Sequence, residues 1–203
     1  MTLARQCRLF AIGSALFALA TVPGFAAAAG AGAANGLCFA GSFFFTSAGW
    51  LQLVRSRSGS RVEYASAATQ FMGTLLFNVS TGAALSAHAA TEQRHLVWAP
   101  DATGSVAFLV SGALGIAAVT AAAGPFAPGS RDWQAQWVNM AGCVAFGASA
   151  LGAFVTPAGV TEDALLANTG TFVGALCFLA AALRVLPPRR AGSPRGRSPG
   201  GPL

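Results

Sequence analysis

Long uncharged, apolar stretches alternate with short clusters of charged residues along this chain. No Asp, Glu, Lys, Arg or His occurs between Leu9 and Val54, a run of 46 residues. A membrane-crossing helix needs roughly 20 apolar residues, so this run is long enough for two such helices and a tight turn. The remaining runs lack the strict alternation of strands and are too long for barrel strands. The predicted membrane spans are 9–29, 32–54, 66–87, 104–123, 133–156 and 164–183.

This pattern predicts an all-α fold, a polytopic transmembrane bundle of about six helices over residues 1–186 with both termini in the cytoplasm (N-in/C-in). Residues 187–203 are rich in Arg, Pro and Gly, with almost nothing apolar to bury, and are predicted to form a disordered cytoplasmic tail. The first span has two interpretations. Pro23 interrupts it, and Met1–Ala29 also has the basic start and apolar middle of a secretory signal peptide. We prefer a retained helix; cleavage would leave five spans.

The composition and the placement of arginine support a bilayer location. Hydrophobic residues make up 54% of the 203 residues and charged residues 9%, whereas a soluble domain is about 25% charged. The net charge is +6, with twelve arginines and no lysine, which is typical of a bacterium with a GC-rich genome. If the six spans alternate in direction, eleven arginines fall on one side, and the positive-inside rule makes that side cytoplasmic. The expected location is therefore the plasma membrane.

The arginines also bear on the partners of this protein. They lie at span ends and in the tail rather than along one helix face, so they indicate membrane topology and not nucleic-acid binding. The lipid bilayer is the expected partner, and the arginines of the tail offer contacts to anionic lipid headgroups. The sequence identifies no protein partner and no oligomeric state.

A short pattern recurs once in every predicted span. It consists of a glycine, a small residue, a phenylalanine four positions after the glycine and a small residue at position seven. These offsets place the residues on one stripe of a helix. Small residues let helices approach closely in lipid, so a phenylalanine is predicted to fill the notch beside a glycine of its neighbour; biased composition alone is the alternative. The copies are Gly13-Ser14-Phe17-Ala20, Gly41-Ser42-Phe45-Ala48, Gly73-Thr74-Phe77-Ser80, Gly104-Ser105-Phe108-Ser111, Gly142-Cys143-Phe146-Ser149 and Gly174-Ala175-Phe178-Ala181.

Polar residues accompany this pattern in the middle of the chain. Gln70, Asp101 and Asn139 each lie three positions before the glycine of their copy. Asp101 is predicted to be a helix N-cap at the membrane surface, and the two amides are predicted to form hydrogen bonds between helices. Gln70, Thr74 and Asn78 share one face of the third span. They either pair with neighbouring helices, which we prefer, or line a small polar cavity.

The glycine-serine-x-x-phenylalanine cores resemble those of the YrhK-like membrane proteins, which are short two-helix membrane domains with no established activity. The segments that carry this resemblance are Gly41-Ser42-Phe43-Phe44-Phe45 and Gly104-Ser105-Val106-Ala107-Phe108. The resemblance implies a membrane location and helical-hairpin units, three of which in tandem would cover most of the chain. It implies no site residues. The long loop expected over His88–Ala102 departs from a simple tandem array.

The sequence carries no complete pattern for a reactive site, so we predict no catalytic, cofactor-binding or metal-binding residues. The four cysteines form no CxxC pair and indicate neither disulfides nor a zinc site. His88, Glu92 and His95 would share one helix face, as metal ligands do, but nothing completes the set. The middles of the predicted spans contain no ionisable residue, which argues against a proton relay or a charge-lined channel.

These observations favour a non-enzymatic helix-packing or accessory component of the membrane. The alternative is a passive carrier or channel for a small uncharged solute, lined by Gln70, Thr74, Asn78 and residues of the fifth span. A second alternative is a metal-dependent enzyme at the outer face, centred on His88 and His95.

Overall fold

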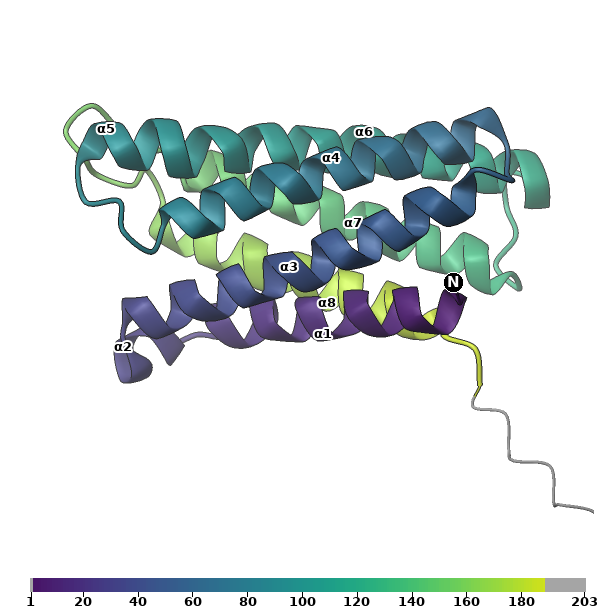
Figure 1. Cartoon of the computed structure of the whole chain (residues 1–203), viewed down its shortest axis with the longest axis horizontal. Helices are drawn as coiled ribbons and strands as arrows, with labels where there is room; N and C mark the ends of the chain where they lie inside the picture. The colour runs from purple at the N-terminus through teal and green to yellow at the C-terminus, as the bar shows by residue number, and fades with distance from the viewer. Residues whose placement is uncertain (1, 189–203) are drawn as a thin grey trace, which may run out of the picture.

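The computed structural model describes residues 2–188, which form a bundle of long helices joined by short connections (Figure 1). The only strand-like feature in this part of the chain is an isolated bridge between Val155 and Thr161. The predicted all-α class is confirmed. The long helices are α1 (Leu3–Thr21), α3 (Ala31–Ser56), α4 (Arg61–Ala83), α6 (Ala99–Ala123), α7 (Arg131–Gly152) and α8 (Ala164–Arg184).

Four helical segments are long and apolar enough to cross a membrane. They are α1, α3, α8 and the continuous segment Ala90–Ala123, which joins α5 (Ala90–Glu92), a π-helical turn η1 (Gln93–Trp98) and α6. The other two long helices, α4 and α7, contain 23 and 22 residues but carry more polar side chains. Length therefore does not separate these two helices from the other four.

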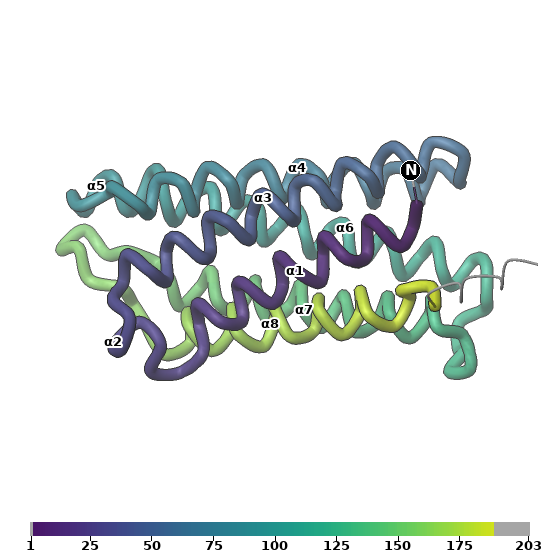
Figure 2. Tube along the Cα trace, turned by 60° about the horizontal axis from the view of Figure 1, so that its bottom comes forward, coloured from purple at the N-terminus to yellow at the C-terminus, as the bar shows by residue number. Residues whose placement is uncertain are grey.

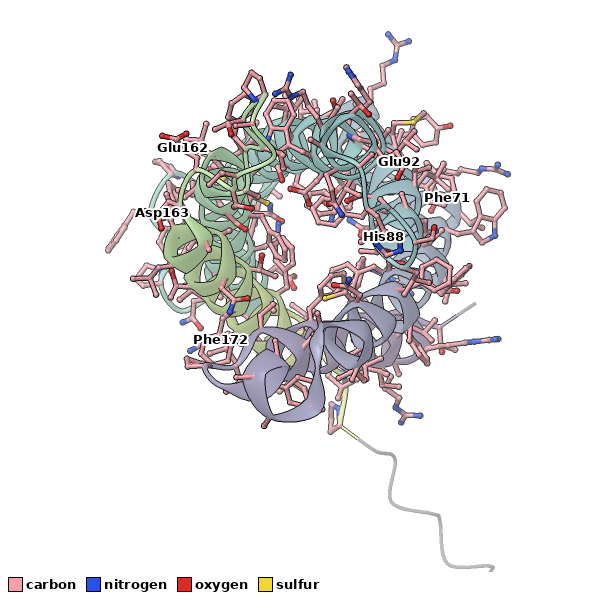
Figure 3. All side chains as sticks on the ribbon, turned by 90° about the vertical axis from the view of Figure 1, so that its left-hand side faces the viewer. Phe71, His88, Glu92, Glu162, Asp163 and Phe172 are labelled. Atoms are coloured by element: carbon pink, nitrogen blue, oxygen red, sulfur yellow. The ribbon has the colours of Figure 1, made fainter. Side chains whose placement is uncertain are left out.

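The six long helices form a closed ring. Each packs against the helix before it and the helix after it in the order α1, α3, α4, α6, α7 and α8, and α8 returns to α1. Figure 3 shows this ring end-on, and Figure 2 shows neighbouring helices running in opposite directions. The N-terminus, the α3–α4 and α6–α7 connections and the last turn of α8 lie together at one end (Figure 1). We call this the arginine end, because Arg94 alone among the described arginines lies at the opposite end.

The outer surface of the ring is apolar, while small polar side chains face inward. Met72 on α4 is 55% exposed and Val144 on α7 is 53% exposed. Ser14, Ser42 and Thr74 have no exposed surface at all. A water-soluble bundle would instead carry mostly polar and charged residues on its outer surface. The arrangement suits a surround of lipid, where only inward-facing groups can have polar partners.

The first helix ends earlier than the sequence predicted. A span over 9–29 was expected, but α1 ends at Thr21 and the short α2 (Phe25–Ala29) follows a turn. Pro23 has no N–H to continue the helix. Gly24 follows with φ of 87°, a left-handed conformation that other residues rarely adopt. The chain therefore turns back toward α3 before residue 29.

The expected loop over His88–Ala102 is largely helical, which also corrects the role of Asp101. The helix that contains α6 begins at Ala90, so Asp101 lies inside it and is not an N-cap. Pro100 lacks the N–H of a regular turn, and the helix widens shortly before it into the six residues of η1, which end at Trp98. Two side chains of η1 bond to the end of α7 and to the connection that follows it: Trp98 Nε1 donates to the Ala150 carbonyl in the last turn of α7 (2.9 Å), and Arg94 Nε donates to the Val155 carbonyl of the α7–α8 connection (3.0 Å).

Two further helices end before the predicted spans do. Helix α4 ends at Ala83 and not at residue 87, and α7 ends at Gly152 and not at residue 156. Helix α4 begins with a capping box, in which Glu63 N–H donates to Ser60 Oγ (3.2 Å) and Ser60 N–H to a Glu63 carboxylate oxygen (2.7 Å). This box fixes the start of α4 at the arginine end.

Candidate functional site

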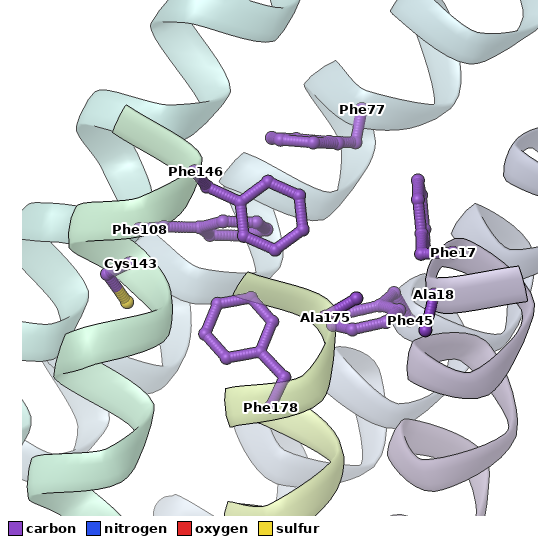
Figure 4. Close-up of a cluster of buried hydrophobic side chains, with 9 residues drawn as sticks. All are labelled: Phe17, Ala18, Phe45, Phe77, Phe108, Cys143, Phe146, Ala175 and Phe178. Carbon is purple, nitrogen blue, oxygen red and sulfur yellow. The ribbon is translucent and has the colours of Figure 1, made fainter. Parts of the chain in front are cut away.

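Six phenylalanines, one from each long helix, meet on the axis of the ring (Figure 4). Each is at most 4% exposed. Phe77 and Phe108 stack with ring centroids 4.9 Å apart, and Phe146 and Phe178 stack at 5.2 Å. Edge contacts join the pairs to one another. We call Phe17, Phe45, Phe77, Phe108, Phe146 and Phe178 the phenylalanine cluster.

These are the phenylalanines of the sequence repeat, and each lies against a glycine of the next helix. A Cβ on Gly73 would lie 2.6 Å from the Phe108 ring, and one on Gly104 would lie 2.7 Å from the Phe77 ring. The same reciprocal contact between glycine and phenylalanine joins α1 with α3 and α7 with α8. There the glycine Cβ positions would lie 2.6–3.0 Å from the nearest ring atom of the paired helix. The predicted packing of phenylalanine into a glycine notch is therefore confirmed in all six copies. It divides the ring into three reciprocal pairs.

A cavity of about 520 Å³ lies between the phenylalanine cluster and the arginine end. All six long helices line it, and Phe45 and Phe178 form part of its inner limit. A second space of only about 10 Å³ lies within the cluster, against Ser42 and five of the six rings. That space holds at most about one water molecule. The cavity thus ends at an aromatic barrier on the axis.

Carboxamide side chains supply much of the polar wall of this cavity. They are Gln6, Gln52, Gln70, Gln136 and Asn139, from α1, α3, α4 and α7. Gln70 is the most buried of them, at 5% exposure, and its Oε1 has no hydrogen-bond partner among the described residues. An unpaired buried acceptor costs about 1–3 kcal/mol. This amide is therefore a group that a water or a ligand in the cavity would satisfy.

Two serines of the wall, one on α4 and one on α6, already bond to each other. Ser66 Oγ donates to the Ser111 carbonyl (2.9 Å), and Ser111 Oγ donates to the Ser66 carbonyl (2.8 Å). These bonds tie α4 to α6 and leave the amides as the available polar groups. Charged side chains lie at the mouth, where Arg55 and Asp132 are exposed and the Glu63 carboxylate caps α4.

The polar residues predicted to share one face of the third span have different partners in the structure. Asn78 pairs with a neighbour, since its Nδ2 donates to Thr46 Oγ1 on α3 (2.8 Å). Thr74 Oγ1 donates to the Phe71 carbonyl of its own helix (2.7 Å). Of these three residues, only Gln70 lines the cavity. The preferred interpretation, pairing between helices, thus holds for Asn78 and is wrong for Gln70. For Thr74 it holds only through the backbone, since the Thr74 carbonyl accepts from Thr46 Oγ1 of α3 (3.3 Å).

Asn139 departs from its prediction as well. It was expected to form a hydrogen bond to another helix, but its Nδ2 donates to Cys143 Sγ of α7 at 3.8 Å. It lines the cavity, as do Gln136, Asp132 and Ala135 of the same helix. Residues of the fifth span therefore do contribute to this site, as the carrier alternative expected.

A spacing in the sequence marks one layer of residues that line the cavity. The residue seven positions from each clustered phenylalanine, toward the arginine end, lines it in every helix. Seven positions are two helical turns, so these residues lie on the same inward face one layer away. Gln6 and Gln136 lie beside this layer and carry no such signal. The six are Phe10, Gln52, Gln70, Gly115, Asn139 and Val185.

The histidine group does not form a ligand set. His88 precedes the helix that begins at Ala90, so His88, Glu92 and His95 do not share one helix face as predicted. The Glu92 carboxylate instead accepts hydrogen bonds from the backbone N–H groups of His88 (3.0 Å) and Ala89 (3.2 Å). Within residues 2–188, no three His, Cys, Asp or Glu side chains lie close enough together to hold a metal ion.

No protein-family model, curated protein or solved structure matches this chain significantly. The resemblance to the YrhK-like proteins stays a prediction.

Proposed function

We propose that all six long helices cross the plasma membrane. Helices α4 and α7 lie in the same ring as the four apolar segments and have comparable lengths. The polar residues of α4 line the cavity or pair with other helices, while Met72 and Val79 are exposed on its outer face. Leu151 and Val144 are similarly exposed on α7. A side chain that faces inward does not have to be transferred into lipid.

We place the arginine end in the cytoplasm, which gives the N-in/C-in topology. Reporter fusions can test this arrangement with alkaline phosphatase, which is active outside, and a fluorescent protein, which is bright inside. Fusions after Gly59 and Gly129 are expected to report the cytoplasm, and fusions after Ser86 and Ala158 the outer side. The Ser86 fusion distinguishes the six-span topology from one in which α4 does not cross the membrane, because in the second case it would report the cytoplasm.

The function that this geometry supports best is a non-enzymatic carrier for a small uncharged polar solute. The observation that supports it is the cavity, which all six helices line and which the phenylalanine cluster closes on the axis. A cavity of this volume is in the range of roughly 300–1,000 Å³ that small-molecule sites occupy. Because the barrier leaves no continuous path, passage requires the rings to move. A carrier or a gated channel fits better than an open pore.

The proposed carrier requires that α1 is retained and not cleaved as part of a signal peptide. Gln6, Cys7 and Phe10 line the cavity, and Phe17 belongs to the cluster. Removal of Met1–Ala29 as a signal peptide would open the ring between α3 and α8.

Osmotic swelling of reconstituted vesicles tests the carrier. Vesicles that contain the purified protein are expected to admit glycerol, erythritol or sorbitol faster than protein-free vesicles. Potassium chloride is expected to cross at the protein-free rate, since the charged residues among those described that line the cavity, Arg55, Glu63 and Asp132, lie at its mouth. Equal rates for every neutral solute in the two kinds of vesicle would rule out the carrier.

The second candidate is the packing or accessory component favoured by the sequence. The reciprocal contacts between glycine and phenylalanine favour it, because they account for the repeat without any solute. An outer-face metal enzyme has no such support. The contact of the tail with anionic lipid concerns residues 189–203 above all, which lie outside the described part of the chain.

A further inference from the structure

We infer that the cavity binds a neutral polyhydroxylated solute and that Gln70 is its specificity-determining residue. This inference rests on the proposed carrier function for its biological meaning. The binding itself stands on three observations: an amide-rich wall, an unpaired buried amide and the absence of charge near that amide among the described residues that line the cavity.

The wall chemistry selects hydroxyl groups. A carboxamide offers N–H donors and an acceptor oxygen, and a hydroxyl group can accept a hydrogen bond from the former or donate one to the latter. Amides reach the cavity from four of the six helices, so a solute with several hydroxyls would find partners on more than one side. An ion would lose its water there without an opposite charge to replace it, which is strongly unfavourable. Neutral polyols therefore fit better than charged solutes of the same size.

Gln70 lies where we expect the discrimination between solutes to be strongest. It is one helical layer from Phe77 and, at 5% exposure, is the most buried of the wall amides. A solute group that bonds its Oε1 would satisfy an atom that has no partner in the described structure. An analogue that leaves this atom unpaired would bind less well. The apolar rings of Phe45 and Phe178 at the inner limit would contact the carbon skeleton.

Binding to the purified full-length protein in detergent tests this inference without any transport step. The probe is radiolabelled sorbitol, with gluconate and 1-amino-1-deoxysorbitol as competitors that keep the carbon chain and add one charge. Sorbitol is expected to bind saturably and to be displaced by unlabelled sorbitol at concentrations at which neither charged analogue displaces it. Absence of saturable binding, or equal displacement by a charged analogue, would overturn the inference.

Substitution at Gln70 makes the test specific to the site. Gln70→Leu keeps the volume and removes the amide, and it is expected to weaken sorbitol binding at least about tenfold, which corresponds to roughly 1.4 kcal/mol. Gln70→Glu is a second variant in case the first does not fold, and it is expected to favour the amino analogue over sorbitol. Gln134→Leu, on α7 but outside the cavity lining, is the control and should bind as the natural protein does.

Unchanged binding in both Gln70 variants would remove Gln70 from the site. Binding without vesicle flux would leave the site in place and refute the carrier. Flux without binding would support the carrier and refute the binding site.

Discussion

Replacing Phe108 with alanine is expected to raise the flux of sorbitol through reconstituted vesicles at least about tenfold, which corresponds to a barrier lower by roughly 1.4 kcal/mol. Phe108 is 2% exposed and contacts Phe77, Phe178 and Phe146, with ring centroids 4.9, 5.8 and 6.3 Å away. Removing its ring enlarges a space of only about 10 Å³ within the cluster. The aromatic barrier would then no longer close the axis.

Two further variants separate this effect from a general loss of structure. Phe108→Leu keeps a bulky side chain and is expected to leave flux near the natural level. Phe43→Ala removes a ring that is 52% exposed on the outer face of α3, and it should change neither flux nor folding. A buried Phe→Ala change typically costs about 3–5 kcal/mol, so the Phe108→Ala protein must first be shown to be monodisperse. A folded Phe108→Ala protein with unchanged flux would show that solute does not travel along the axis.

The phenylalanine cluster could be predicted because its sequence signal lies within each helix. The spacing of Gly104, Ser105 and Phe108 fixes one face of one helix, and it recurs in the other five. The cavity could not be predicted in the same way. It exists because six such faces close into a ring, and nothing in a single helix tells whether Gln70 meets a partner or a space. Asn78, about two turns further along α4, meets Thr46, to which its Nδ2 donates.

Errors in the helix boundaries have a local cause. The cluster of charged and turn-forming residues before Gly104 predicted a loop, yet the chain stays helical from Ala90. A helix can accommodate a proline where the turn before it widens, and here η1 precedes Pro100. Trp98 bonds to the last turn of α7, and Arg94 bonds to the α7–α8 connection. Those bonds join residues 52 and 61 positions apart, and such tertiary contacts are invisible in the local pattern.

Replacing Gly41 with alanine is expected to lower the free energy of unfolding by about 1–3 kcal/mol, the range for an overpacked interior. A Cβ at this position would lie 3.0 Å from the Phe17 ring and 3.1 Å from the Gly13 carbonyl oxygen, so the backbones of α1 and α3 would have to separate. Gly36 lies in the same helix with no atom within 4 Å of its Cβ position. Gly36→Ala should therefore leave the free energy unchanged or raise it slightly, because alanine is the better helix former.

Reversible unfolding in mixed detergent micelles would measure both variants, and a double mutant identifies the contact itself. Phe17→Leu shortens the side chain that the new methyl group meets. Gly41→Ala combined with Phe17→Leu is expected to lose less free energy than the two single changes added together, with a coupling above about 0.5 kcal/mol. Part of the loss would remain, because the Gly13 carbonyl does not move with the ring. Equal changes in the free energy of unfolding for Gly41→Ala and Gly36→Ala would mean that the glycine notch at Gly41 does not stabilise the packing of α1 against α3.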